Sequence, residues 1–301
     1  MKIAIAIGDP NGIGPEIAVK AAQKAAVEVV LVGDAFVIER YGKVKTKDVK
    51  ALPREAFKPG TLDPRAGAAT VAYAREAVRL AQAGEVDAVV GCPHSETAIN
   101  RAGIKFSGYT GLIAELTGTP ADRVFLMLVA AGLRLAHVTL HESVAAALSR
   151  VTEDLVVAAG IAAVRAVQRL GIHKPRLAVF GINPHAGEDG LWGLEDENIT
   201  KPAVAELRKR GHAVDGPTGG DVILSQRRHD VYLAMFHDQG HIPMKLLSPL
   251  RSSALTIGTP VLFSSVGHGC AYDIAGQGVA DATSVEETLV LLAAAKQCGG
   301  R

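Results

Sequence analysis

The sequence is poor in cysteine, in aromatic residues and in net charge. Its three cysteines are widely spaced and form no Cys-x-x-Cys pair, so neither a disulfide framework nor a thiolate zinc site is indicated. A net charge of +1 is too small to produce an electrostatic field that would attract nucleic acid or a membrane surface, so a small-molecule partner is expected. The chain opens without a signal-peptide pattern, and no apolar run reaches the roughly 18 residues of a membrane span. We expect a soluble, cytoplasmic protein with reduced thiols.

The chain is instead rich in Ala, Val and Leu, and strand-like runs alternate with helix-like segments. Its 301 residues suffice for two ordinary α/β domains or one large one. Thr152 reads as a helix N-cap, and Gly84 and Gly171 stand where helices should end. The pattern predicts an α/β fold with mainly parallel sheets. The predicted strands are 3–7, 86–91, 176–181 and 231–236, and the predicted helices begin near Pro15 and span 66–83, 153–170 and 198–210.

Three histidines, His141, His185 and His237, stand at the ends of short apolar runs. Because a parallel sheet places successive strand ends along one edge, three neutral imidazoles there could converge on a divalent metal. Each histidine alone is more often a hydrogen-bonded packing residue, but turn-forming Asn183-Pro184 and Asp238-Gln239-Gly240 flank two of them. The set predicts a metalloenzyme. Zinc suits three imidazoles, although manganese, cobalt, nickel and magnesium remain open.

A glycine-rich turn, Gly8-Asp-Pro-Asn-Gly-Ile-Gly-Pro-Glu16, follows the first predicted strand. Its GxxxGxG spacing matches neither the dinucleotide fingerprint nor a Walker A motif. A tight strand-to-helix turn with Pro15 at the first helical position explains most of it, and a direct phosphate role is the less favoured interpretation.

A stronger cofactor signal lies in His268-Gly-Cys-Ala-Tyr-Asp-Ile-Ala-Gly-Gln-Gly-Val-Ala-Asp281. Small residues permit close backbone approach, and Asp273 can accept hydrogen bonds from ribose hydroxyls and repel a 2′-phosphate, which favours NAD over NADP. The segment resembles the adenosine-binding loop of the isopropylmalate and isocitrate dehydrogenase superfamily. That resemblance implies NAD-binding roles for His268, Gly269, Asp273, Ile274 and, outside the segment, Gly258.

The resemblance also implies two α/β domains with the active site in the cleft between them. Residues 1–118 plus 255–301 would form a terminal domain with the cofactor loop. Residues 119–254 would form a central domain carrying the metal ligands and the dimer contacts.

Three motifs in order narrow the family: the Gly8–Glu16 turn, Asn183-Pro-His-Ala-Gly-Glu188 and His237-Asp-Gln-Gly240. Together they resemble the 4-hydroxythreonine-4-phosphate dehydrogenase family over essentially the whole chain. This resemblance implies a homodimer with the active site at its interface. It places the metal ligands on His141, His185 and His237, with Asp221 and Asp238 nearby.

The sequence departs from the phosphate-handling members of that family. Lys245 is retained, but the family's asparagine and arginine fall on Ala254 and Phe263, its His-Lys pair on Ser95-Glu96, and its Gly-His-Thr on 108–110. Losing two cations and gaining two aromatics should weaken a phosphate site, which implies a flatter, more apolar substrate. Ordinary packing positions for Phe263 and Tyr109 are the alternative. The implied substrate-binding residues are Tyr109, Thr110, Lys245 and Phe263.

With these departures, the sequence most closely resembles the terephthalate cis-dihydrodiol dehydrogenases of aromatic degradation. The resemblance implies oxidation of 1,2-dihydroxy-3,5-cyclohexadiene-1,4-dicarboxylate with NAD, releasing carbon dioxide and leaving protocatechuate. Lys245 is then a candidate carboxylate clamp or proton relay, or else a surface lysine, and Asp238 or Asp221 would orient a metal ligand. Two alternatives stay open: a dehydrogenase of 4-hydroxythreonine phosphate or a threonate or erythronate phosphate, and a regulator built on a retired dehydrogenase scaffold.

Overall fold

The computed structural model describes residues 1–249 and 251–297, which form two compact units. The first comprises residues 1–118, 251–254 and 260–294, and the second residues 119–249, 255–259 and 295–297. This division differs from the boundary expected after residue 254, because residues 251–254 fall in the first unit and 255–259 in the second. Cys92 and Cys270 are buried free thiols, and Cys298 lies outside the described residues.

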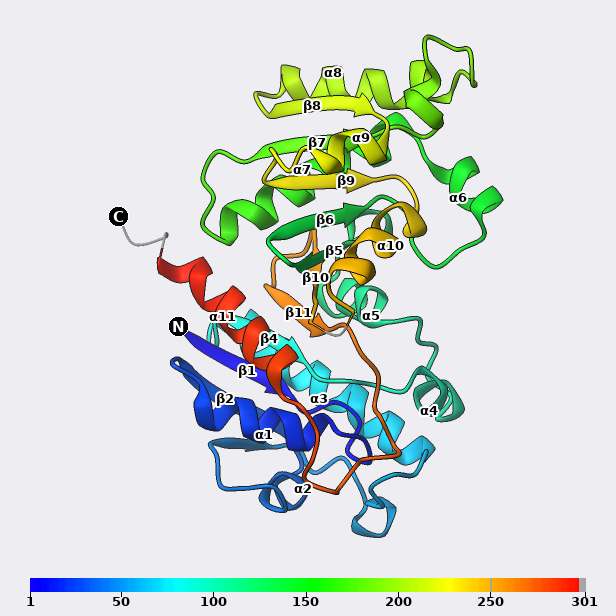
Figure 1. The fold of residues 1–301 in the computed structure, drawn as a ribbon. Helices are drawn as coiled ribbons and strands as arrows, with labels where there is room; N and C mark the ends of the chain where they lie inside the picture. Colours follow the sequence, from blue (N-terminus) through cyan, green and yellow to red (C-terminus); the bar gives the residue numbers. More distant parts are fainter. Residues whose placement is uncertain (250, 298–301) are drawn as a thin grey trace. The chain divides into compact units, whose positions relative to one another are not determined.

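The first unit is built on parallel strands in the order β3-β2-β1-β4-β11 (Figure 1). Residues 3–6 of β1 have no exposed surface, as expected for a parallel sheet with both faces covered. Its elements are β1 (Lys2–Ala6), α1 (Gly14–Lys24), β2 (Glu28–Gly33), α2 (Ala35–Glu39), β3 (Thr46–Asp48), α3 (Pro64–Gln82), β4 (Ala88–Gly91), α4 (Glu96–Arg101), α5 (Tyr109–Thr117), β11 (Phe263–Val266) and most of α11 (Thr283–Gln297).

The second unit has the strand order β5-β6-β9-β7-β8, in which β5 and β6 are antiparallel and the remaining pairs are parallel (Figure 1). Its elements are β5 (Phe125–Ala130), β6 (Leu133–His137), α6 (Val144–Arg150), α7 (Glu153–Arg169), β7 (Arg176–Phe180), α8 (Lys201–Lys209), β8 (Ala213–Thr218), α9 (Gly220–Ser225), β9 (Val231–Ala234) and α10 (His237–Leu247). One further strand, β10 (Ser253–Ile257), contains residues of both units. Among the described helices, none has the length and apolar character of a membrane span.

The parallel strands of the second unit bring the predicted site residues to one edge of the sheet. Because β6, β9, β7 and β8 run in the same direction, their carboxyl ends share that edge. The segments that leave those ends carry His141 after β6, His237 after β9, His185 after β7 and Asp221 after β8. The sequence-based expectation of strand-end histidines on one parallel sheet edge is confirmed.

The helices begin and end close to the predicted positions, with one informative difference. Thr152 caps α7 by accepting a hydrogen bond from the Leu155 amide at 3.2 Å, as predicted. The predicted helix 198–210 instead begins with a π-helical turn at Asp196–Thr200 and continues as α8. The buried Asp196 carboxylate connects this turn to the loop that carries His185, since it accepts hydrogen bonds from the amides of Ile182 and Asn183.

Candidate functional site

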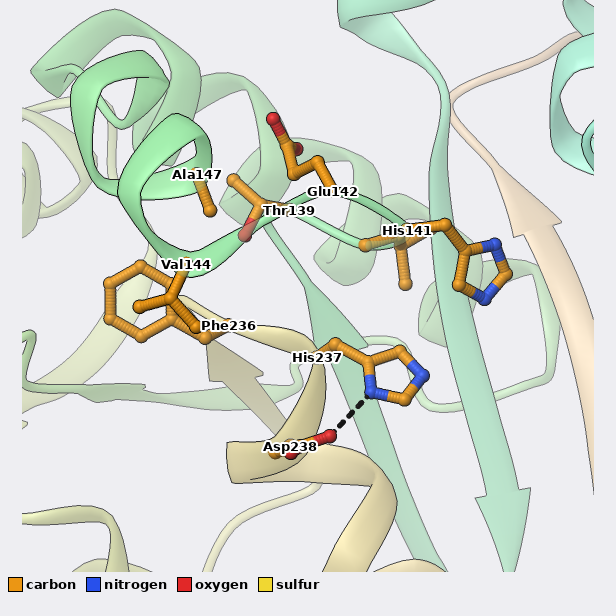
Figure 2. A pocket seen from close by; sticks show the side chains of 9 residues that line it. Thr139, His141, Glu142, Val144, Ala147, Phe236, His237 and Asp238 are labelled. Carbon is orange, nitrogen blue, oxygen red and sulfur yellow. Dashed lines mark hydrogen bonds and ion pairs between the residues drawn. The ribbon is translucent and has the colours of Figure 1, made fainter.

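His141 and His237 lie side by side. Their ring centroids are 5.5 Å apart, and the rings are tilted by 48°. Figure 2 shows both rings projecting to the same side, His141 from the loop after β6 and His237 from the first turn of α10, with Phe236 and Val144 on the other side of the backbone. All four residues line a cavity of about 230 Å³. Two imidazoles are therefore available at one point of the sheet edge.

A carboxylate fixes which nitrogen of His237 is available. Nδ1 of His237 lies 2.7 Å from Oδ1 of Asp238, and an ionised carboxylate can only accept. Nδ1 therefore donates, and Nε2 keeps its lone pair. Metal-ligating histidines commonly donate their other ring N–H to a carboxylate, and an orienting role for Asp238 stays a prediction.

Two further histidines, His137 and His241, pack against the ring of His237. The ring of His241 stacks on that of His237 at 3.7 Å with an angle of 11°, and its Nδ1 lies 3.1 Å from Nε2 of His137. His137 has no exposed surface, and its Nδ1 faces the carbonyl of Leu126 at 3.4 Å. Because a carbonyl only accepts, His137 donates to Leu126 and accepts from His241. Burial lowers the pKa of His137 to about 3 and that of His241 to about 4, so both rings are neutral at neutral pH.

Sequence reasoning left His137 as core or neighbour and gave His241 no specific role. The spacing of His237 and His241 was the available signal, because residues four apart on a helix are neighbours.

Gly240 allows α10 to approach His137. A Cβ at this position would lie 2.2 Å from Nε2 of His137 and 2.3 Å from Cδ2 of Leu135. Gly240→Ala is therefore expected to destabilise the protein by ~1–3 kcal/mol, measured as a lower urea midpoint. Gly111→Ala is the matched helical control, because the nearest atom to its Cβ would be 3.8 Å away. Equal loss in both variants, or none in Gly240→Ala, would contradict the close contact.

His185 lies on a strained loop away from the pair. Residues 185–190 all have positive φ, including 52° at His185, and this backbone conformation is strained for residues other than glycine. Its side chain is 69% exposed, and its Nδ1 lies 3.1 Å from Oε2 of Glu188. Asp221 belongs to the same neighbourhood, since a Cβ on Gly219 would lie 2.9 Å from Oδ1 of Asp221 and 3.8 Å from Cα of His185.

One chain therefore supplies an incomplete set of ligands. Within residues 1–249 and 251–297, no group of three or more His, Cys, Asp or Glu side chains is placed to hold a metal ion. The structure brings His141 and His237 together and leaves His185 with Glu188 and Asp221. A divalent metal at the histidine pair needs at least one more ligand from elsewhere.

Lys245 lies one helical turn after His241 on α10. Partial burial lowers its pKa, and its charge contributes to lowering the pKa of His241. The ammonium therefore belongs to the surroundings of the histidine cluster, unlike a fully solvated surface lysine.

The aromatic residues expected to bind substrate are packed in the first unit. Phe263 has no exposed surface and Tyr109 is 5% exposed, and their ring centroids are 5.0 Å apart. The Tyr109 hydroxyl donates to the Cys92 carbonyl at 3.0 Å, and a Cβ on Gly91 would collide with both rings. Direct substrate contact by Phe263 and Tyr109 thus needs surface that the structure does not expose. The alternative interpretation, ordinary packing, describes them.

Tyr109 belongs to an aromatic layer that also includes Phe106 and contacts His94, a residue to which sequence reasoning gave no specific role. His94 packs edge-on against Tyr109 at 4.5 Å and against Phe106 at 5.0 Å. Its side chain is 21% exposed, and burial lowers its pKa to about 4. The aromatic layer therefore presents a neutral imidazole, while Thr110 is half-buried in the first turn of α5.

The predicted cofactor residues His268 and Gly269 line a second cavity, of about 390 Å³. Nδ1 of His268 faces the Gly269 carbonyl at 3.2 Å and therefore donates, so Nε2 accepts from the Ser284 hydroxyl at 2.6 Å. Asp273 is exposed and Ile274 is half-buried in the same segment.

Gly258 lies in the second unit and meets a backbone constraint. Its φ is +91°, and a Cβ there would lie 2.0 Å from the Arg123 carbonyl oxygen. Tight packing thus accounts for this glycine without a ligand.

Comparisons with known proteins agree with this architecture. The chain is 52% identical to a 1,2-dihydroxy-3,5-cyclohexadiene-1,4-dicarboxylate dehydrogenase from Comamonas sp, over 97% of each chain. It is 38% identical to a D-threonate 4-phosphate dehydrogenase from Cupriavidus necator, over 95% of each chain. The crystal structure of a terephthalate 1,2-cis-dihydrodiol dehydrogenase from Burkholderia xenovorans LB400 superposes with a TM-score of 0.79 at 50% identity, covering 98% of both chains.

A β-decarboxylating dehydrogenase from Thermococcus kodakarensis shares the fold at 14% identity, with a TM-score of 0.52 and coverage of 97% of this chain and 82% of that one. The α/β fold with its large, mostly parallel sheet is thus the one expected from the sequence. The family of the pyridoxal phosphate biosynthetic protein PdxA matches residues 4–292, so the chain belongs to the PdxA family and is a dehydrogenase acting on a CH–OH group.

Proposed function

We propose that this enzyme oxidises a terephthalate cis-dihydrodiol with NAD and a divalent metal, forming protocatechuate, carbon dioxide and NADH. The observation that carries the proposal is the His141–His237 pair, with Asp238 fixing the His237 tautomer, in a chain 52% identical to a dehydrogenase of that diol. Both neighbouring imidazoles are of the ligand type that zinc prefers.

The residues present favour a dicarboxylate over a phosphate ester. The positions of the family's asparagine and arginine hold Ala254 and Phe263, which are 9% and 0% exposed. A phosphate dianion needs charge-assisted hydrogen bonds, and neither side chain supplies one. Lys245, whose pKa is lowered by partial burial, remains to hold one carboxylate.

The diol and NAD together account for all atoms and electrons of the proposed reaction. Its second carbon loses a hydride to NAD and its hydroxyl loses a proton, which gives a ketone beta to the carboxylate on the first carbon. That carboxylate leaves as carbon dioxide, its bonding electron pair forms the ring double bond to the ketone carbon, and the ketone oxygen takes up a proton to become the second hydroxyl of the aromatic product. A bound divalent ion would polarise the reacting hydroxyl. Asp238 holds His237 in the tautomer that leaves Nε2 available, and Lys245 holds a carboxylate or moves the proton.

A second copy of this chain is proposed to supply the missing ligand. Exposed apolar side chains lie close in sequence to all three histidines of the second unit, and exposed apolar surface is typical of an interface. Val144 and Leu148 lie on α6, Leu191, Trp192 and Leu194 follow His185, and Ile242 and Leu246 lie on α10. Because one chain pairs His141 with His237, we infer a homodimer in which the third imidazole is His185 of the partner subunit.

The activity is tested with purified protein, NAD and the dihydrodiol. We expect NADH absorbance to rise together with protocatechuate and carbon dioxide, and a chelator to abolish the rise. Parallel reactions with 4-hydroxythreonine phosphate and threonate phosphate should be much slower. Turnover of a phosphate ester alone would replace the proposed substrate, and dinucleotide binding without NADH formation on any of them would favour the regulator.

The cofactor preference is tested at Asp273. Asp273→Lys replaces a hydrogen-bond acceptor for ribose with a cation, and we expect kcat/KM for NADP relative to NAD to rise about tenfold or more. Glu39→Lys is the control, an equal charge change at an exposed residue of the same unit. An unchanged cofactor ratio in Asp273→Lys would remove the ribose contact.

A further inference from the structure

The glycine-rich turn after β1 is tied to the cofactor loop through Glu16. The Glu16 side chain is 2% exposed and accepts hydrogen bonds from the amides of Ala280 at 2.8 Å and Gly278 at 3.2 Å. Lys20, one helical turn later, donates to the carbonyls of Gly278 at 2.9 Å and Ala280 at 2.8 Å, and to Glu16 itself at 2.7 Å. One ion pair on α1 thus satisfies four backbone groups of a segment about 260 residues away in sequence.

The same turn holds the other end of the loop. The Tyr272 hydroxyl donates to Asp9 at 2.7 Å, and the Ile13 amide donates to the Cys270 carbonyl at 2.9 Å. A Cβ on Gly12 would lie 2.8 Å from the Cys270 side chain, so glycine is required for this approach. The loop is fixed near residue 270 and again near residue 280.

The segment between these two attachments carries the predicted ribose contacts. Asp273 and Ile274 lie in turns and not in a helix or strand, and the turns are closed by hydrogen bonds from the Ile274 amide to the Ala271 carbonyl at 3.1 Å and from the Gln277 amide to the Ile274 carbonyl at 3.2 Å. Ala271 and Asp281, near its two ends, line the cavity of His268. These turn bonds are local, so the place of Asp273 relative to α1 depends on the contacts at both ends of the segment.

We propose that Glu16 and Lys20 are positioning residues for the dinucleotide, because they hold the loop of residues 270–280 in the shape that presents Asp273 and Ile274 to the adenosine ribose. The inference rests on the proposed NAD dependence. It gives the Gly8–Glu16 turn a role different from phosphate binding, since its carboxylates hold the protein segment that meets the cofactor.

The test compares two lysines of α1. Lys20→Met removes the donor to Gly278 and Ala280, whereas Lys24→Met removes the surface contact to Glu286, in which the lysine is 70% exposed. NADH affinity is measured by fluorescence titration, and hydrogen exchange at residues 270–280 is measured without metal or cofactor. We expect Lys20→Met to weaken NADH binding about tenfold and speed exchange in the loop, with KM for the diol unchanged. Lys24→Met should match the wild type in each measurement.

Glu16→Gln is the second variant, since it keeps the shape of the side chain and should weaken NADH binding in the same way. Wild-type NADH affinity in folded Lys20→Met would overturn this inference even if loop exchange accelerates, because the contacts would then serve the fold alone. If wild-type protein binds no NADH at all, the proposed function fails and this inference fails with it.

Discussion

Mixing two inactive variants, His185→Ala and His237→Ala, is expected to restore activity to about one quarter of the wild-type level. Each variant alone should stay folded and lose both metal and turnover, because each removes one imidazole from every site. The restoration follows from the placement of the histidines: His141 and His237 are neighbours in one chain, and His185 lies apart on its own loop.

The expected level comes from counting sites. Random pairing makes about half of the dimers mixed, and each mixed dimer has one complete site and one site lacking two imidazoles. In the complete site, the His185→Ala chain contributes His141 and His237, and the other chain contributes His185. The measurement is NADH production after co-expression or subunit exchange, with metal content determined on the same samples.

The matched control is a mixture of His141→Ala and His237→Ala. These residues belong to the same chain's half of each site, so no mixed dimer contains a complete set and activity should stay absent. Restoration by this control, or its absence for His185→Ala with His237→Ala, would show that the three imidazoles are not divided between copies as proposed.

The sequence was sufficient to place the histidines at a sheet edge but not to assemble them. Apolar runs that end in His237-Asp238 and near His141 mark strand ends, and parallel strands then bring these ends together. The path of the loop at His185 depends on six successive positive φ values, at residues 185–190, and on the buried Asp196, which accepts hydrogen bonds from the amides of Ile182 and Asn183. No local sequence pattern predicts either feature. The path of this loop therefore determines whether the third imidazole can come from the same chain.

Residue type alone also does not determine exposure. By the family resemblance, Tyr109 and Phe263 replace polar residues, which suggested that they face a substrate. Packing over Gly91 buries both rings and leaves His94 only partly exposed, and the contact between Tyr109 and Phe263 joins residues far apart in sequence. The same limitation hid His137, since its support of His241 depends on how α10 lies against β6.

Lys245→Met is expected to lower kcat/KM for the dihydrodiol by about 10²–10⁴-fold while leaving metal content and NADH affinity unchanged. Methionine keeps the length and much of the apolar volume of the stem, so the change removes mainly the charge and the hydrogen-bond donors. Lys174→Met, at an exposed residue of the same unit, is the control and should retain activity.

Lys245→Arg separates the two roles open to this residue. A guanidinium still holds a carboxylate but does not release a proton at neutral pH, so a clamp predicts partial retention of kcat/KM and a proton relay predicts loss as severe as in Lys245→Met. Partial burial already lowers the pKa of Lys245, which brings the ammonium closer to the range in which a lysine can exchange protons. Wild-type kinetics in Lys245→Met would exclude both roles and leave the carboxylates of the diol to other side chains.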